Sequence, residues 1–218
     1  MKNKPISPWL WYITAIPFVY LLATYGDLPA NIPIHYNTRG EADRWGHKAI
    51  LWIFPILVVL VMLLMARLVP QLDRDGKLAQ MGKKYEWLSI VIVGAIAAIM
   101  TYFIHQAGNE QLKGLNGLLI IFGLLYSFLG NFTINIPPNY FVGFRLPWTL
   151  KYEGVWRITH RFSGQLWFWS GLVIATLSLW VPIEWTIPVL LGITIIICLI
   201  PTIYSWRAYR KMIDGDMI

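Results

Sequence analysis

Six long apolar runs constrain the fold of this chain more than any other feature of its sequence. Runs of this kind cross about 30 Å of hydrocarbon as α-helices, because a helix rises about 1.5 Å per residue. We therefore predict an all-α, polytopic integral membrane protein with about six transmembrane helices. The predicted spans are roughly Trp9–Tyr25, Ala49–Val69, Trp87–His105, Leu115–Ile134, Leu166–Val181 and Trp185–Trp206.

The composition supports a membrane protein. Of the 218 residues, 57% are hydrophobic and 13% are charged, whereas a soluble domain carries about a quarter charged residues. The chain also has 12 Trp and 11 Tyr, and such rings favour the interface between water and lipid. The net charge of +7 is then best explained by basic cytoplasmic loops, so we predict contact with anionic lipids and no direct binding of nucleic acid.

The distribution of Lys and Arg gives the orientation. If the N-terminus is inside, 14 of the 18 Lys and Arg fall on the cytoplasmic side and four fall outside. The positive-inside rule therefore predicts two cytoplasmic termini and a multi-pass protein of the plasma membrane. We expect a single membrane domain over 1–218, with an N-terminal helix pair at 9–70 that carries a structured outer loop at 26–48. The C-terminal region at 115–206 carries an inner loop at 135–165.

The outer loop reads "LPANIPIHYNTRGEADRWGHK". Pro29 and Pro33 favour extended or turned backbone, and Gly40 is free to adopt positive φ in a turn. We predict a compact cap over the first two spans, in which His35, Asp43 and Trp45 form the outer binding surface.

The same loop raises the question of a metal site. It concentrates His35, Glu41, Asp43 and His47, and imidazole and carboxylate are ordinary zinc ligands. Their spacing matches no metal-binding motif, so we predict no metal, with metal binding by this loop as the minority alternative. We also predict no cofactor.

The inner loop combines charged and aromatic residues in "NYFVGFRLPWTLKYEGVWRITHRFSGQLW". A helix is expected from about Thr149, with Glu153 and Arg157 paired at i,i+4 on one face. The pattern predicts an interfacial helix that leads into the fifth span, basic on one side and aromatic on the other. A simpler alternative is that the arginines anchor the chain to lipid headgroups. The predicted inner binding surface consists of Asn139, Tyr140, Arg145, Glu153, Trp156, Arg157, His160 and Arg161.

Catalysis and transport are less well supported than binding. No Asp, Glu, Lys or Arg lies near the middle of a predicted span, and ion-coupled transporters usually need such a group. No recognisable catalytic set is present either, so we predict no catalytic residues. Two alternatives stay open, namely a membrane-embedded enzyme that uses Glu153, His160 and Arg145 at the cytoplasmic loop, and a small-molecule transporter.

Both loops resemble a known family. "NYFVGFRLPWTL" with "EGVWRITHRFSGQLW" resembles the C-terminal signature of the SdpI family of bacterial membrane proteins, and the outer loop resembles a small uncharacterised domain often found at their N-terminus. One departure is Lys151-Tyr152-Glu153-Gly154, where the family pattern has a stronger helix cap. That family includes the immunity protein against the sporulation-delaying toxin, so the resemblance implies immunity against a secreted, membrane-active peptide toxin. It also implies a second role, as a signal receptor that sequesters a cytoplasmic transcriptional repressor.

Overall fold

The computed structural model of the protein describes residues 5–37, 40–73, 76–112 and 114–215. In these residues the chain is mostly helical, with one two-stranded sheet. The elements are α1 (Pro8–Thr24), β1 (Asn31–Tyr36), β2 (Ala42–His47), η1 (Lys48–Trp52), α2 (Ile53–Leu63), η2 (Leu64–Leu68), α3 (Val69–Leu72), α4 (Lys77–Met81), α5 (Lys83–Gln106), α6 (Gly117–Thr133), α7 (Pro147–Lys151), α8 (Glu153–Leu177), η3 (Ile183–Trp185) and α9 (Thr186–Ile213).

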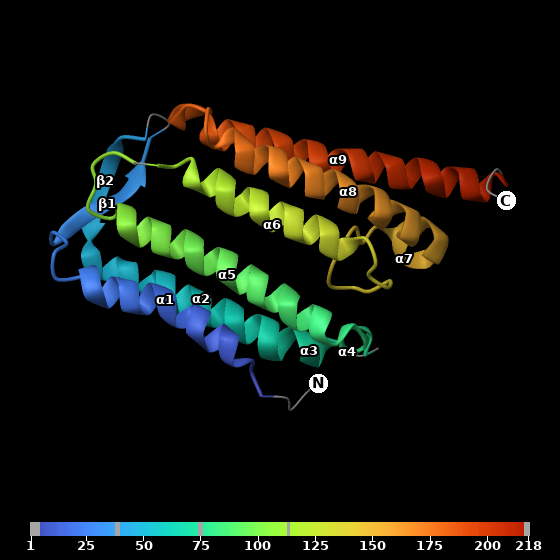
Figure 1. Ribbon diagram of the computed structural model, residues 1–218, viewed down its shortest axis with the longest axis horizontal. Helices are drawn as coiled ribbons and strands as arrows, with labels where there is room; N and C mark the ends of the chain where they lie inside the picture. Colours follow the sequence, from blue (N-terminus) through green and yellow to red (C-terminus); the bar gives the residue numbers. More distant parts are fainter. Residues whose placement is uncertain (1–4, 38–39, 74–75, 113, 216–218) are drawn as a thin grey trace.

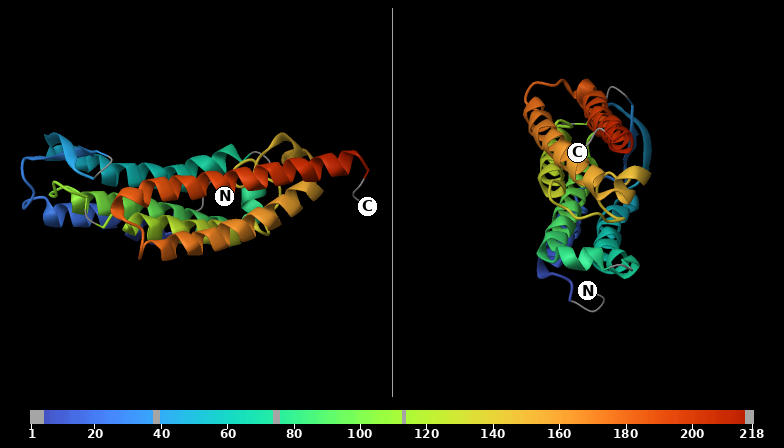
Figure 2. Two further views of the ribbon diagram at one scale, coloured as in Figure 1. Left: turned by 90° about the horizontal axis from the view of Figure 1, so that it is seen from above. Right: turned by 90° about the vertical axis from the view of Figure 1, so that its right-hand side faces the viewer.

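The long helices form an elongated bundle (Figure 1). Helices α1 and α2 pack on α5, while α8 packs on α6 and on α9. Contacts between α5 and α6 join these two groups, which lie on opposite sides of the bundle when it is viewed end-on (Figure 2). The start of α1 and the end of α9 both point away from the β1–β2 hairpin, which covers the opposite end of the bundle (Figure 1).

The surface of the bundle is apolar along its long helices, in agreement with the hydrophobic composition of the chain. Three helical stretches are long and apolar enough to cross a membrane, Lys48–Leu72, Lys83–Gln106 and Ile183–Ile213, and two shorter apolar helices cover Pro8–Thr24 and Gly117–Thr133. Large apolar side chains are exposed along these helices, as is expected where lipid replaces water. Exposed Trp rings lie near both ends of the bundle, at Trp9, Trp87, Trp180 and Trp185, and this arrangement is typical of interfacial aromatic belts.

The outer loop folds into an antiparallel hairpin. Strand β1 pairs with β2 from Asn31 opposite His47 to Tyr36 opposite Ala42. Gly40 has a φ of 76° at the turn end of the hairpin, a conformation that glycine adopts without steric cost. The Tyr36 hydroxyl donates a hydrogen bond to the carbonyl of Asn109 at 2.9 Å and also lies 3.4 Å from the carbonyl of Gln106, so the hairpin is fastened to the end of α5.

Helix α2 continues through a π-helical turn, η2, into α3. The amide of Val69 donates to the carbonyl of Leu64, and the next residue, Pro70, has no N–H to offer the carbonyl of Met65. The Tyr85 hydroxyl fills this vacancy and donates to the Met65 carbonyl at 2.5 Å. A side chain of α5 therefore completes the backbone hydrogen bonding of the second helical rod, which is needed where no water is present.

Helices α6 and α8 approach each other so closely that their backbones touch. Gly123 and Gly130 of α6 face Gly171 and Gly164 of α8, and a Cβ atom at any of the four would overlap backbone atoms of the other helix. Small residues permit such close packing in membranes, where van der Waals contact drives helix association. The hydroxyl of Ser127 donates to the carbonyl of Phe168 at 3.0 Å and adds a polar contact to this seam.

Helix α9 contains Pro201, which removes one hydrogen bond from the helix interior. The carbonyl left without its helical donor is that of Ile197, four residues earlier. The indole N–H of Trp167 on α8 donates to this carbonyl at 2.8 Å. The proline in α9 and the tryptophan in α8 therefore act together to fix the two helices against each other.

Candidate functional site

The inner loop between α6 and α7 is organised by Asn139, whose side chain is buried. Its amide oxygen accepts hydrogen bonds from the amides of Phe141 and Val142, both at 2.8 Å. Its amide nitrogen donates to the carbonyls of Pro137 and Val142. One side chain thus satisfies several backbone groups of a loop that lacks regular structure, in the way that Asn commonly stabilises turns.

His160 fastens this loop to α8. The amide of Phe144 donates to His160 Nε2 at 2.9 Å, while His160 Nδ1 lies 2.8 Å from the carbonyl of Trp156. Since a carbonyl only accepts, Nδ1 carries the proton and Nε2 is the acceptor. The imidazole is therefore neutral when both bonds are formed.

The surroundings of His160 favour the neutral ring. The side chain is fully buried, and its ring stacks on that of Trp156 with 3.8 Å between centroids. It lies in the inner segment 135–165, before the predicted span Leu166–Val181. Burial lowers the pKa of His160 to about 4, and the bond to the Trp156 carbonyl opposes this shift only in part.

Gly143 leaves room for the ring of His160, and Trp156 holds the start of the inner loop. Gly143 has a φ of 105°, and a Cβ atom there would overlap the His160 ring. The buried indole of Trp156 donates to the carbonyl of Ile136 at 2.9 Å. It packs in a core cluster that also includes Leu78 and Leu88, so the inner loop is held against α4 and α5 as well.

The short helix α7 is set at an angle to α8 by a break at Tyr152, which has extended φ and ψ values of −121° and 109°. The predicted helix from Thr149 is therefore two helices. Thr149 is buried; its hydroxyl accepts from the amide of Leu146 and donates to the carbonyl of Phe144.

Aromatic rings link α7 to the end of α9. The indole of Trp148 donates to the hydroxyl of Ser205 at 3.0 Å, and its ring contacts those of Trp206 and Tyr209. Lys151 and Arg210 lie over the rings of Tyr152 and Trp206, respectively. Helix α7 and the end of α9 thus form an aromatic cluster with cations at its border.

The eight predicted inner residues divide into two groups. Asn139, Trp156 and His160 are buried and build the loop, whereas Tyr140, Arg145, Glu153, Arg157 and Arg161 are exposed. The amphipathic helix predicted to lie in the interface is instead the first part of the continuous helix α8, with Trp156 and His160 in its packed face. A surface that meets a partner can use the second group only.

The exposed group has few internal contacts. Arg157 donates twice to Glu153 Oε1, at 3.1 and 2.7 Å, and both side chains are more than half exposed, so this pair contributes less than about 1 kcal/mol to stability. Arg145 donates to the Tyr140 carbonyl at 2.7 Å. The three groups considered for catalysis therefore have separate surroundings, because His160 is buried while Glu153 and Arg145 face outward.

In the outer hairpin, His35 and Asp43 meet across the strands with 2.6 Å between Nδ1 and Oδ1. Trp45 lies on β2 with 53% of its surface exposed. Glu41 accepts from Asn37, and His47 accepts from the amide of Ala49 at the start of η1. Among the described residues no three side chains of the metal-ligating type gather at one point.

The sequence interpretation missed three residues that shape the inner site. Gly143 and Trp148 lie within the quoted stretch without a predicted role, and Thr149 enters only as the start of a predicted helix. The glycine between Val142 and Phe144 is a signal for a left-handed turn, and the Leu-Pro-x-Thr that begins at Leu146 is a signal for a capped helix start. The partner of each residue, however, lies 16 or more positions away or depends on a local fold that the pattern alone does not specify.

Comparisons with known proteins match two separate parts of the chain. Residues 135–205 match the SdpI/YfhL protein family, and residues 12–59 match a domain of unknown function, DUF1648. Immunity protein SdpI of Bacillus subtilis (strain 168) is 24% identical over 213 residues, which cover 97% of this chain and 98% of that relative. No solved structure matches the chain. The resemblance read from the two loops is thus confirmed. This chain is a relative of the SdpI/YfhL protein family, and its N-terminal part carries a match to the DUF1648 domain.

Proposed function

We propose that this protein is a multi-pass protein of the bacterial plasma membrane that protects its cell against a secreted, membrane-active peptide toxin. The observation that carries the proposal is the match to Immunity protein SdpI, which extends over 97% of the chain and includes both loops. The exposed apolar side chains of the long helices support a location in the bilayer.

The proposed topology has six transmembrane helices and both termini in the cytoplasm. The 14-to-4 distribution of Lys and Arg supports it, as does the arrangement in which the start of α1 and the end of α9 point away from the hairpin (Figure 1). We expect a reporter enzyme that works only in the cytoplasm to be active when it is fused after Ile218. Activity of a reporter that works only outside the cell would contradict this topology.

The direct test of immunity is a toxin challenge. A strain sensitive to the sporulation-delaying peptide toxin is grown with and without this protein, and survival is measured over a series of toxin concentrations. Protection that depends on expression supports the proposal. Equal killing of the two cultures, with the protein present in the membrane, would refute it for this toxin.

We further propose that the exposed inner group, Tyr140, Arg145, Glu153, Arg157 and Arg161, is a recognition surface for a cytoplasmic protein partner of the repressor type. Arg145 and Arg157 present planar guanidinium groups, which bind carboxylate or phosphate in a two-pronged geometry that lysine does not reproduce. Lysine keeps the charge that topology requires.

The substitutions Arg145→Lys and Arg157→Lys test this surface. We expect normal membrane levels, because the charge is retained, and a loss of protection or of signalling of about fivefold to tenfold, because a charge-assisted contact is lost. Arg207→Lys is the matched control, since Arg207 is an exposed arginine near the inner end of α9. Full function of all three variants would mean that these arginines serve as membrane anchors.

A further inference from the structure

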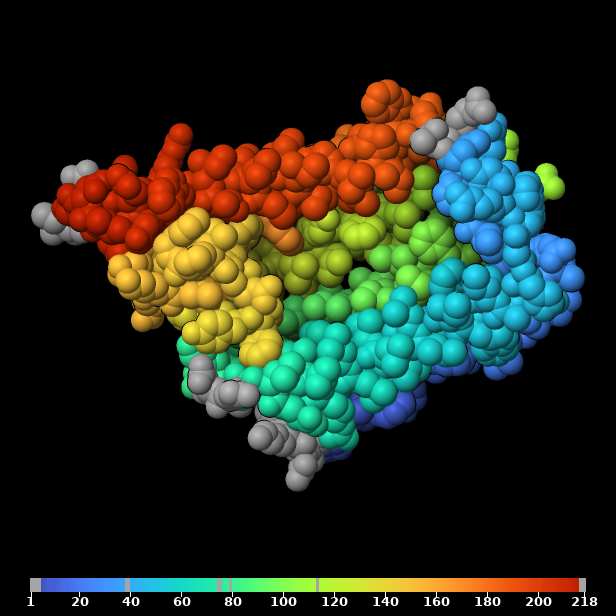
Figure 3. All heavy atoms as spheres, turned by 180° about the vertical axis from the view of Figure 1, so that it is seen from behind, coloured from blue at the N-terminus to red at the C-terminus, as the bar shows by residue number. Residues whose placement is uncertain are grey.

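A cavity lies beneath the β1–β2 hairpin, between the two halves of the bundle. It has a volume of about 540 Å³ and is lined by the hairpin, by Phe103 of α5, by Leu118 of α6 and by Ile187 and Leu191 of α9. Figure 3 shows this face hollowed between α2 and α9, with α5 and α6 as the floor and the hairpin closing one end. A second cavity, of about 440 Å³, continues the hollow on the other side of Ile34, Tyr36 and Phe103, which line both cavities.

The cavity is suited to apolar groups that arrive from the membrane. Its volume falls within the range of about 300 to 1,000 Å³ that is usual for ligand sites. Ile34, Ile187 and Leu191 line it and are themselves exposed, so the hollow is open to the surroundings of the bundle. Leu191 lies on a helix that is long and apolar enough to span the bilayer, so apolar groups are expected to occupy this part of the cavity.

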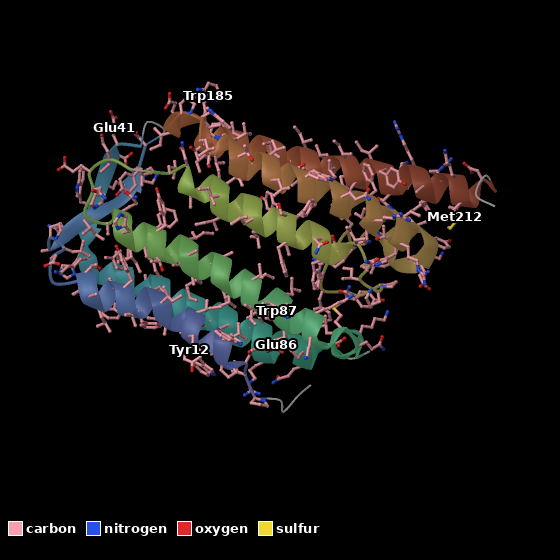
Figure 4. All side chains as sticks on the ribbon, viewed as in Figure 1. Tyr12, Glu41, Glu86, Trp87, Trp185 and Met212 are labelled. Carbon is pink, nitrogen blue, oxygen red and sulfur yellow. The ribbon has the colours of Figure 1, made fainter. Side chains whose placement is uncertain are left out.

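The rim of the cavity carries one carboxylate, that of Glu184. Glu184 of η3 lines it and is exposed, and in the described part of the chain it forms no ion pair. His35 also lines the rim and is bonded to the Asp43 carboxylate. The neighbouring Trp185 lies at the same end of the molecule as Glu41 of the hairpin (Figure 4). A cationic group on an apolar body is complementary to this combination of a carboxylate rim and an apolar floor.

We propose that this cavity binds an apolar segment of the peptide toxin that carries a cationic group, with the cation at Glu184 and apolar side chains against Phe103, Leu118 and Leu191. The inference rests on the proposed function and assigns its toxin site to the membrane-facing hollow under the hairpin. The hairpin then serves as the roof of the site, and its cross-strand pair His35–Asp43 borders the entrance.

Two substitutions test the cavity. Leu191→Trp fills it from an exposed position, so the fold does not have to accommodate a buried change, and it should abolish most of the binding. Glu184→Gln removes the charge while keeping the size of the side chain. It should weaken binding by up to about fivefold, the range of an exposed ion pair. The matched controls are Leu199→Trp, at an exposed apolar position of α9 outside the cavity, and Glu110→Gln, an exposed acidic residue outside it.

Binding is measured on the full chain reconstituted in phosphatidylcholine vesicles, with two fluorescent probes. One is the sporulation-delaying toxin, and the other is a synthetic peptide of 17 leucine and alanine residues with one terminal lysine. Toxin protection is measured in cells for the same variants. Weaker binding and protection for Leu191→Trp and Glu184→Gln, with unchanged controls, is the expected result.

The outcomes separate the site from the function. If the unmodified protein protects cells and both cavity variants protect and bind equally well, the cavity proposal is overturned and the immunity function stands. If the unmodified protein gives no protection but the synthetic peptide binds in a manner sensitive to Leu191→Trp, the function fails and the cavity is supported. If mass spectrometry finds a lipid that Leu191→Trp displaces and neither peptide competes with it, the occupant is a lipid and the proposal is wrong.

Discussion

Replacing Gly171 by leucine is expected to separate helices α6 and α8 and to destabilise the protein by about 3 kcal/mol or more, the upper range for overpacking a tightly packed interior. A Cβ atom at this position would overlap the carbonyl oxygen of Gly123 and atoms of Ser127 on the facing helix. These atoms belong to backbone or to a short side chain, so they cannot rotate away. The helices have to move apart, which also breaks the bond between Ser127 and Phe168.

The measurement is the thermal unfolding of purified protein in detergent, together with its level in membranes. Gly192→Leu is the matched control, because a Cβ at Gly192 of α9 meets no atom within 4 Å. Gly171→Ala should fall between the two. Equal stability of the Gly171→Leu and Gly192→Leu variants would show that the backbones of α6 and α8 are not in contact.

Lowering the pH from about 6.5 to about 4 is expected to destabilise the inner site by about 3 kcal/mol through His160 alone. The folded protein holds the pKa of His160 at about 4, below the usual value near 6.5. In this pH range the unfolded chain therefore binds a proton that the folded chain does not. The stabilisation is fully present above pH 6.5 and is lost as the pH falls towards 4. Protonation places a hydrogen on Nε2, which then no longer accepts from the Phe144 amide.

Other groups also titrate in this range, so the comparison with His160→Gln isolates the contribution of His160. Glutamine offers an acceptor for the Phe144 amide and a donor on the same group, and it does not titrate. The unfolding midpoint of the unmodified protein should fall more steeply between pH 6.5 and pH 4 than that of the variant. Parallel pH curves for the two proteins would contradict the assigned role of His160.

The sequence predicted the helices better than it predicted their contacts. Five of the six predicted apolar runs coincide with the helical stretches that are apolar in the structure, because hydrocarbon-length runs of Leu, Ile and Val leave little alternative to a helix. The sixth, Leu166–Val181, coincides as far as Leu177 with the second part of α8, whose first part carries Glu153, Arg157 and Arg161. The glycine seam between α6 and α8 was not predicted, since a glycine in an apolar run does not indicate which helix it faces.

In the candidate site, too, the sequence predicted a contact within one helix but not the contacts between distant segments. The i,i+4 spacing was sufficient to predict the pair Glu153–Arg157, because helix geometry alone brings the two side chains together. The burial of His160 and Trp156 could not be predicted in this way. It depends on a loop that begins 20 residues earlier, at Ile136, and folds back along α8. The mixture of charged, polar and aromatic residues in the inner loop predicted a binding surface. Part of that mixture, namely Asn139, Trp156 and His160, is buried and stabilises the loop instead.

The bond between Trp167 and the Ile197 carbonyl has a consequence for how this family can diverge. Proline at position 201 leaves a carbonyl without its helical donor, and the indole of Trp167 supplies the missing hydrogen. A lineage that lost the tryptophan first would carry an unsatisfied carbonyl inside the bilayer until the proline was also replaced. We therefore expect positions 167 and 201 to covary among homologous chains, with proline at 201 accompanied by a side-chain N–H donor at 167, although the two positions are 34 residues apart in the sequence.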